Sequence, residues 1–217
     1  MRLFNYFPAR ARVGRSFVVA AALTVLLAGP TLGAPEDHQA FSPPGTAAVY
    51  ATGYTTGVPG AWSLVARKPS GLAMVIHAVG LTPGHAYAAW WVVFNAPAFC
   101  THPNATVGAR CGDGDLPTNE GDPRVQVTMA YATGHVVDGA AGVGTTDFAA
   151  WLPANAAIGP IVGPGLLDPA AAEVHLVLTD LGSASAELDA YQLRALADGC
   201  MGEAIACPVA QVSYQPA

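Results

Sequence analysis

Histidine side chains are the groups in this chain best suited to bind a metal or to transfer a proton near neutral pH. Six are present, and His77, His135 and His175 lie in the part of the chain that we expect to fold. Strand alternation places His77 on the face of Val75 and His175 on the face of Glu173, so the sequence does not require these histidines to converge. One hypothesis is a copper or zinc site gathered from separate strands, with the three histidines as candidate ligands. We favour the interpretation that these histidines have ordinary structural roles.

A second possible site is the acidic, glycine-rich stretch Cys111–Asp122, which reads CGDGDLPTNEGD. It does not match the spacing of an EF-hand loop, and acidic loops of this kind are usually solvated turns. We therefore expect no cofactor, with calcium as the alternative and Asp113 and Asp115 as its first candidate ligands. The oxygen-bearing side chains of the stretch, of the type that calcium takes, are Asp113, Asp115, Asn119, Glu120 and Asp122.

Catalytic signatures are missing from the sequence. It contains no G-x-S-x-G, H-E-x-x-H or S-x-x-K pattern and no glycine-rich loop of the type that binds phosphate. A glycosidase pair would have to come from the fifteen acidic residues, and the sequence does not give their separations. We therefore assign no catalytic residue and favour a non-enzymatic function.

The first 34 residues have the features of an export signal. Four arginines occur before residue 16, and Phe17–Leu27 is an uninterrupted apolar run. This run is shorter than the roughly 20 residues that span a bilayer, so we expect cleavage near Gly33 or Ala34 and no stable membrane insertion afterwards. Residues 35–46 are polar and proline-rich, which predicts a flexible segment before a single folded domain, residues 47–217.

All four cysteines follow the expected signal, as suits disulfide formation in an oxidising compartment. Of the three possible pairings we favour the two local ones, Cys100–Cys111 and Cys200–Cys207. Each would close a short loop rich in glycine, proline or aspartate. A zinc site is the alternative, but no pair of cysteines has the close spacing of a zinc knuckle. Leader and cysteines together predict a secreted protein, extracellular or periplasmic.

The charge balance excludes one class of partner. Four of the nine basic residues lie in the leader, which leaves five against fifteen acidic residues, a formal charge of −10 for the exported part. Such a surface repels phosphate backbones, and no basic stripe offsets it. We therefore expect no nucleic-acid partner.

Short apolar runs separated by turn residues predict an all-β fold. The chain has 24 Gly and 18 Pro, and the turns Lys68–Gly71 and Leu81–Gly84 are both short enough for β-hairpins. We expect an antiparallel β-sandwich of about eight strands, with a β-barrel as the alternative. The expected strands are Ala47–Tyr54, Trp62–Arg67, Leu72–Val79, Ala86–Phe94, Val125–Ala132, Thr145–Leu152, Glu173–Thr179 and Val209–Tyr214.

Two of these strands have informative patterns. Ala86–Phe94 is apolar on both faces, which predicts a central strand, and Val125–Tyr131 carries its large apolar residues at every second position. The stretch Ala184–Asp198 has loosely helical spacing and predicts one short helix, although it also fits a strand followed by a loop.

Four stretches of the exported part are GLTPGHAY (80–87), WWVVFN (90–95) with Pro97 and Cys100, ATGHVV (132–137) and AEVHLVL (172–178). Together they resemble a group of uncharacterised secreted bacterial proteins. The resemblance implies secretion and a single domain, and it transfers no catalytic role. That group has His-Gly-Pro where this chain has Leu181-Gly-Ser. The layout also has a fainter similarity to chordin-type and copper-zinc superoxide dismutase-like sandwiches, without the clustered histidines of the latter.

From these observations we expect a secreted, non-enzymatic β domain that binds an extracellular or envelope partner. A metal-binding domain, with copper, zinc or calcium, or a redox-linked domain is the first alternative. A hydrolase whose site is assembled across loops is the second. An apolar or aromatic patch favours binding, converging histidines or acids favour a metal, and a pocket with a perturbed acid or base favours an enzyme.

Overall fold

The fold is described from a computed structural model of the chain. The described residues are 45–51, 53, 56–138, 144–155, 161–184 and 208–217, and all belong to one compact unit, His38–Ala217. The expected export signal, the expected helix after Ala184, and Cys200 and Cys207 lie outside the described residues. No helix long and apolar enough to cross a membrane occurs in the described part of the chain.

Nine strands form one sheet within the described residues, and all eight strands expected from the sequence are among them. The strand that the sequence did not predict is β7, a two-residue strand too short to give a periodic signal. The strands are β1 (Ala47–Ala51), β2 (Gly57–Lys68), β3 (Gly71–Leu81), β4 (His85–Phe94), β5 (Val127–Val136), β6 (Gly144–Pro153), β7 (Ile161–Val162), β8 (Glu173–Ser183) and β9 (Val209–Gln215).

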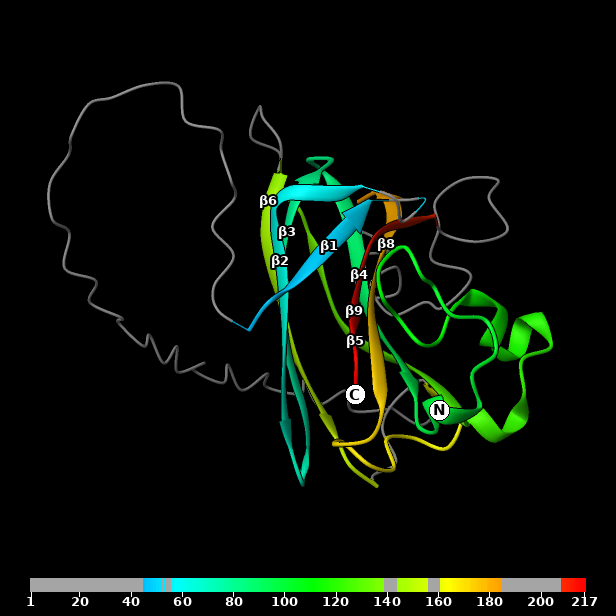
Figure 1. The fold of residues 1–217 in the computed structure, drawn as a ribbon. Helices are drawn as coiled ribbons and strands as arrows, with labels where there is room; N and C mark the ends of the chain where they lie inside the picture. The colour runs from blue at the N-terminus through cyan, green and yellow to red at the C-terminus, as the bar shows by residue number, and fades with distance from the viewer. Residues whose placement is uncertain (1–44, 52, 54–55, 139–143, 156–160, 185–207) are drawn as a thin grey trace, which may run out of the picture. The chain divides into compact units, whose positions relative to one another are not determined.

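The sheet is antiparallel and curls almost into a barrel. Its strand order is β6-β3-β2-β1-β9-β8-β4-β5-β7, and β5 returns close to β6 at the other end of this order. Figure 1 shows the strands wrapped around a common interior. The all-β, antiparallel expectation is confirmed, and the single curled sheet corresponds to the barrel alternative.

One of the two expected hairpins forms. Strands β2 and β3 pair directly up to Lys68 and Gly71, and a Cβ on Gly71 would collide with the carbonyl oxygen of Leu152. The expected hairpin at Leu81–Gly84 is wrong, because β3 lies between β2 and β6 whereas β4 lies between β8 and β5. Both β3 and β4 therefore already have a partner on each edge. The turn runs across the end of the barrel from β3 to β4 instead of pairing these two strands.

The barrel interior is filled by alternate residues of facing strands. Trp91 on β4, Met74 on β3, Phe148 on β6 and Leu176 on β8 belong to the same buried apolar cluster. Polar side chains also lie inside: the Ser63 and Ser213 hydroxyls are 2.5 Å apart, and Gln215 Nε2 donates to Ser63 at 2.8 Å.

The opposite face of β4 is buried as well, as its sequence predicted. Trp90, Val92 and Phe94 are all at least 95% buried, although they point away from the barrel interior. The loop between β4 and β5 covers part of this outer face (Figure 1). It carries four short 3-10 helices, η1 (Pro97–Phe99), η2 (Asp113–Asp115), η3 (Pro117–Asn119) and η4 (Pro123–Val125).

Candidate binding site

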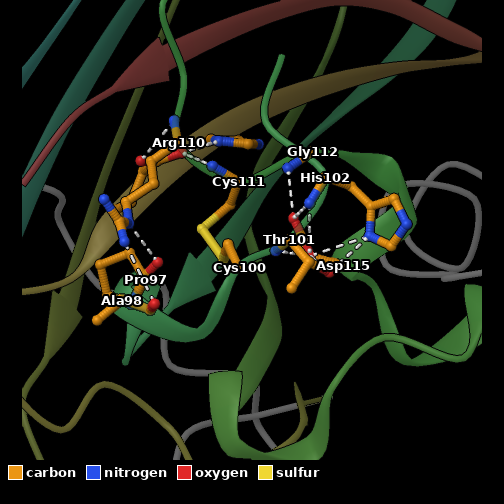
Figure 2. The surroundings of a disulfide bond; sticks show 11 residues. Pro97, Ala98, Cys100, Thr101, His102, Arg110, Cys111, Gly112 and Asp115 are labelled. Atoms are coloured by element: carbon orange, nitrogen blue, oxygen red, sulfur yellow. Dashed lines mark hydrogen bonds and ion pairs between the residues drawn. A yellow bond between two sulfur atoms is a disulfide. The ribbon is translucent and has the colours of Figure 1, made fainter. Parts of the chain in front are cut away.

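A disulfide closes the loop that covers the outer face. Cys100 and Cys111 are bonded, with a Cα–Cα distance of 5.2 Å, which confirms the first expected pair. The Arg110 side chain adds to this closure by donating to the carbonyl oxygens of Pro97, at 2.7 Å, and Ala98, at 3.2 Å (Figure 2). The bridge is of the kind found in proteins that mature in an oxidising compartment.

Asp115 is the second constraint within this loop. Its buried carboxylate accepts hydrogen bonds from the backbone N–H groups of Thr101, at 2.8 Å, His102, at 3.2 Å, and Gly112, at 3.0 Å (Figure 2). Burial alone would raise the pKa of Asp115, but these hydrogen bonds outweigh burial and lower it. Asp115 therefore behaves as an internal cap for backbone amides.

The candidate ligands of the calcium alternative do not gather around a common point in the described part of the chain. Asp115 is turned inward to backbone amides, while Asp113 is exposed and its backbone carbonyl accepts from Asn119 Nδ2 at 2.7 Å. Asp122 pairs instead with Arg124. Backbone amides engage the Asp115 carboxylate and Arg124 engages that of Asp122, so two of the acidic side chains of the loop are already committed to contacts within it.

Glu173 at the start of β8 connects the disulfide loop to the barrel. Its buried carboxylate accepts from the backbone N–H of Arg110, at 3.1 Å, from that of Cys111, at 2.9 Å, and from His175 Nε2, at 2.9 Å. Burial would raise the pKa of Glu173, but the hydrogen bonds from His175 and from the backbone N–H groups of Cys111 and Arg110 outweigh burial and lower it. Glu173 thereby fixes both the loop position and the orientation of the histidine ring.

His175 lies in an aromatic environment. The residue is 4% exposed, and its ring centroid is 4.6 Å from that of Phe94 and 4.5 Å from that of Tyr214. Only the Nε2 side of the ring has a hydrogen-bond partner among the described residues, and that partner is Glu173. A carboxylate partner fixes the proton on Nε2 and leaves Nδ1 as the other polar atom of the ring.

The other candidate histidines are elsewhere and do not join His175. His77 on β3 is paired with Asp147 at 2.7 Å and stacks on Trp62, and His135 on β5 packs edge-on against Phe148. In the described part of the chain, the one group of three potential ligands within metal-binding distance is Cys100, Cys111 and Asp115, and its two sulfurs form the disulfide.

A pocket lies on the outer face of the sheet, beside His175. Its volume is about 340 Å³, at the lower end of the range for small-molecule sites. Most of its lining is apolar, and Asp113, Leu116 and Asn119 of the η2–η3 segment form part of its wall. The remaining lining residues described are Trp90, Val92, Phe94, Met129, His175, Val177, Thr179, Val209, Val212 and Tyr214.

Strand register explains how these side chains come together. Met129, Val92, His175 and Tyr214 are successive cross-strand partners on β5, β4, β8 and β9, so they form one row across four strands. The next row, two residues along each strand, includes Trp90 and Val177 in the same way. Two rows of side chains on one face therefore make the pocket floor.

Sequence reasoning named His175 and Asp113 but not the pocket that contains them. Two signals were present. The run Ala86–Phe94 is apolar on both faces, and a strand of this kind must be covered on its outer face as well. Alternation also places Glu173 and His175 on one face of their strand. Neither signal indicates which loop forms the cover.

Comparisons with known proteins give no relative for this chain. No family model, no curated protein and no solved structure matches it. The fold and the site define its class as an antiparallel, barrel-like all-β domain with a disulfide-closed loop and an apolar outer pocket.

Proposed function

We propose that this protein is a secreted, non-enzymatic binding domain whose outer pocket takes a small apolar molecule. The observation that carries the proposal is the pocket itself, a cavity of about 340 Å³ floored by apolar side chains from four strands. Pockets of this size with a few polar groups are typical of small-ligand sites.

The arrangement of charged groups supports binding rather than catalysis. The two buried carboxylates with a lowered pKa among the described residues, Asp115 and Glu173, accept backbone amide hydrogen bonds that hold the loop in place. A carboxylate with these hydrogen-bond partners stabilises the fold. The expected secretion is supported by the export signal in the sequence and by the disulfide Cys100–Cys111.

The loop that forms one wall is held before any ligand arrives. Three features hold Arg110 and Cys111 in place: the disulfide, the hydrogen bonds of the Arg110 side chain, and the Glu173 carboxylate. Asp115 holds Gly112 in the same way. Leu116 and Asn119 follow shortly after these anchors and face the pocket. Because the wall is already ordered, binding costs little further conformational entropy. Burial of a modest apolar area is then enough to hold a small ligand.

The proposal is tested with naphthalene as a probe and the four tryptophan indole N–H signals as reporters in two-dimensional NMR. Trp90 lines the pocket, whereas Trp62, Trp91 and Trp151 do not. We expect naphthalene to shift the Trp90 signal in a saturable way and to leave the other three nearly unchanged. Uniform shifts of all four signals, or none, would refute a specific pocket.

A pair of variants sharpens this test. Val177→Phe fills the centre of the pocket floor and is expected to abolish the Trp90 response. Val136→Phe makes the same change at a side chain that is 38% exposed on β5 and outside the pocket lining, and it is expected to preserve the response. Loss of the response in both variants would argue against binding in the pocket.

A further inference from the structure

The polar part of the pocket floor is the His175 ring. Its Nε2 donates to the Glu173 carboxylate at 2.9 Å, so the neutral ring carries its lone pair on Nδ1. No described residue makes a hydrogen bond to Nδ1, and the ring lines the pocket while being 4% exposed. A hydrogen-bond acceptor is thus available in a mostly apolar cavity, where an unmade hydrogen bond is costly.

The other polar groups near the floor are already engaged. Trp90 Nε1 donates to the Thr179 hydroxyl at 3.2 Å, and this hydroxyl donates to the Ala88 carbonyl oxygen at 3.2 Å. At the wall, Asp113 brings a carboxylate that disfavours an anionic ligand. The site therefore suits a neutral molecule that carries its own hydrogen-bond donor.

The walls around His175 favour an aromatic ligand over an aliphatic one. Phe94 and Tyr214 flank the imidazole with centroids 4.6 and 4.5 Å away, and Trp90 contributes a third ring to the lining. Aromatic rings pack well edge-on or offset against such neighbours. The pocket volume of about 340 Å³ suits a molecule of one or two fused rings.

From these observations we infer that the pocket selects a neutral aromatic molecule bearing one hydroxyl, which donates a hydrogen bond to His175 Nδ1. This inference rests on the proposed function, since it names the ligand class of the same pocket. Glu173 is a positioning residue in this scheme, because it holds the ring in the required tautomer without touching the ligand.

The experiment compares 2-naphthol with naphthalene and 2-methoxynaphthalene at pH 8, using the full protein and the Trp90 indole signal. The methoxy compound keeps the oxygen but has no donor. We expect 2-naphthol to bind about threefold to tenfold more tightly than either analogue, the gain of one hydrogen bond. The ¹⁵N signal of His175 Nδ1 is expected to shift with 2-naphthol alone, a readout that packing differences do not produce.

The variant His175→Phe is expected to bind all three probes with similar affinity, with folding checked by circular dichroism. The ligand comparison in the unaltered protein decides the question if this variant does not fold. Equal binding of 2-naphthol and naphthalene would overturn the selectivity while leaving the pocket proposal intact. Failure of every probe to shift the Trp90 signal would instead overturn the proposed function, and the selectivity with it.

Discussion

Glu173 and His175 are two residues apart on β8 and meet through a 2.9 Å hydrogen bond on the outer face of the barrel, where both are almost completely buried. The same carboxylate accepts the backbone N–H groups of Arg110 and Cys111. One side chain thus links the barrel, the disulfide loop and the histidine of the pocket floor.

Replacement of Glu173 by Gln tests this link. The Gln amide keeps one acceptor oxygen but brings an NH₂ group toward backbone N–H donors, so we expect a loss of about 2–3 kcal/mol in the free energy of unfolding. Urea denaturation with the disulfide intact measures it. The control is Glu120→Gln, an exposed residue of the same loop, which should leave the midpoint unchanged. Equal effects in the two variants would contradict the anchoring role.

Acid should destabilise the protein through the same carboxylate and Asp115. Both have a lowered pKa in the folded state, so the unfolded chain takes up protons first as pH falls. Their contribution to stability is complete above the pKa values of the unfolded chain and is lost progressively below about pH 4.5. Unfolding free energies measured from pH 6 to about pH 3 should show this decline, and it should flatten in the variant E173Q/D115N. If the free energy of unfolding of that variant still fell with pH at the same slope, other groups would be the cause of the acid sensitivity. The control is Asp138→Asn, at an exposed position.

Removal of the disulfide should affect both stability and binding. The bridge spans a sequence separation of 11, and closing such a loop stabilises a fold by about 3 kcal/mol through chain entropy. The variant C100A/C111A should therefore unfold at lower urea concentration and bind naphthalene more weakly, because Leu116 and Asn119 follow the released segment. Binding that survives unchanged, measured below the unfolding transition, would show that the wall does not need the bridge.

Arg67 holds the end of the described chain against the loop before β8. Its guanidinium donates to the carbonyl oxygens of Pro169 and Ala172, at 2.7 and 2.8 Å, and to those of Gln215 and Pro216, at 3.2 and 2.7 Å. Lysine has three donors on one nitrogen and cannot reproduce this fork. We expect Arg67→Lys to cost about 1–2 kcal/mol, seen as a lower Tm. Lys68→Arg, at the neighbouring exposed position, should have no such effect; a matching loss there would contradict a specific role for Arg67.

Export is tested by expression of the full chain in a bacterial host. We expect the exported protein to begin near Ala34 or Pro35, determined by N-terminal sequencing, because the apolar run Phe17–Leu27 ends before small residues. Non-reducing peptide mapping of the same material should also recover Cys200 linked to Cys207. Retention of the uncleaved chain in the cytoplasm would contradict the export prediction.

The amino-acid sequence by itself determined the strands and the first disulfide, since both depend on local information. Short apolar runs between turn residues predicted the eight longer strands, and the doubly apolar run Ala86–Phe94 predicted that β4 would be a central strand, buried on both faces. The short loop between Cys100 and Cys111 favoured their pairing. Each of these features follows from neighbours along the chain.

Tertiary structure decided which strands pair and what covers the outer face. The turn at Leu81–Gly84 is short enough for a hairpin, yet β3 and β4 take other partners, because pairing is chosen by the burial of whole faces across the sheet. Residues distant in sequence, such as Met129, Val92, His175 and Tyr214, form one row only once the register is set. The pocket exists because long-range register and a loop anchored by Glu173 act together, and neither leaves a periodic mark in the sequence.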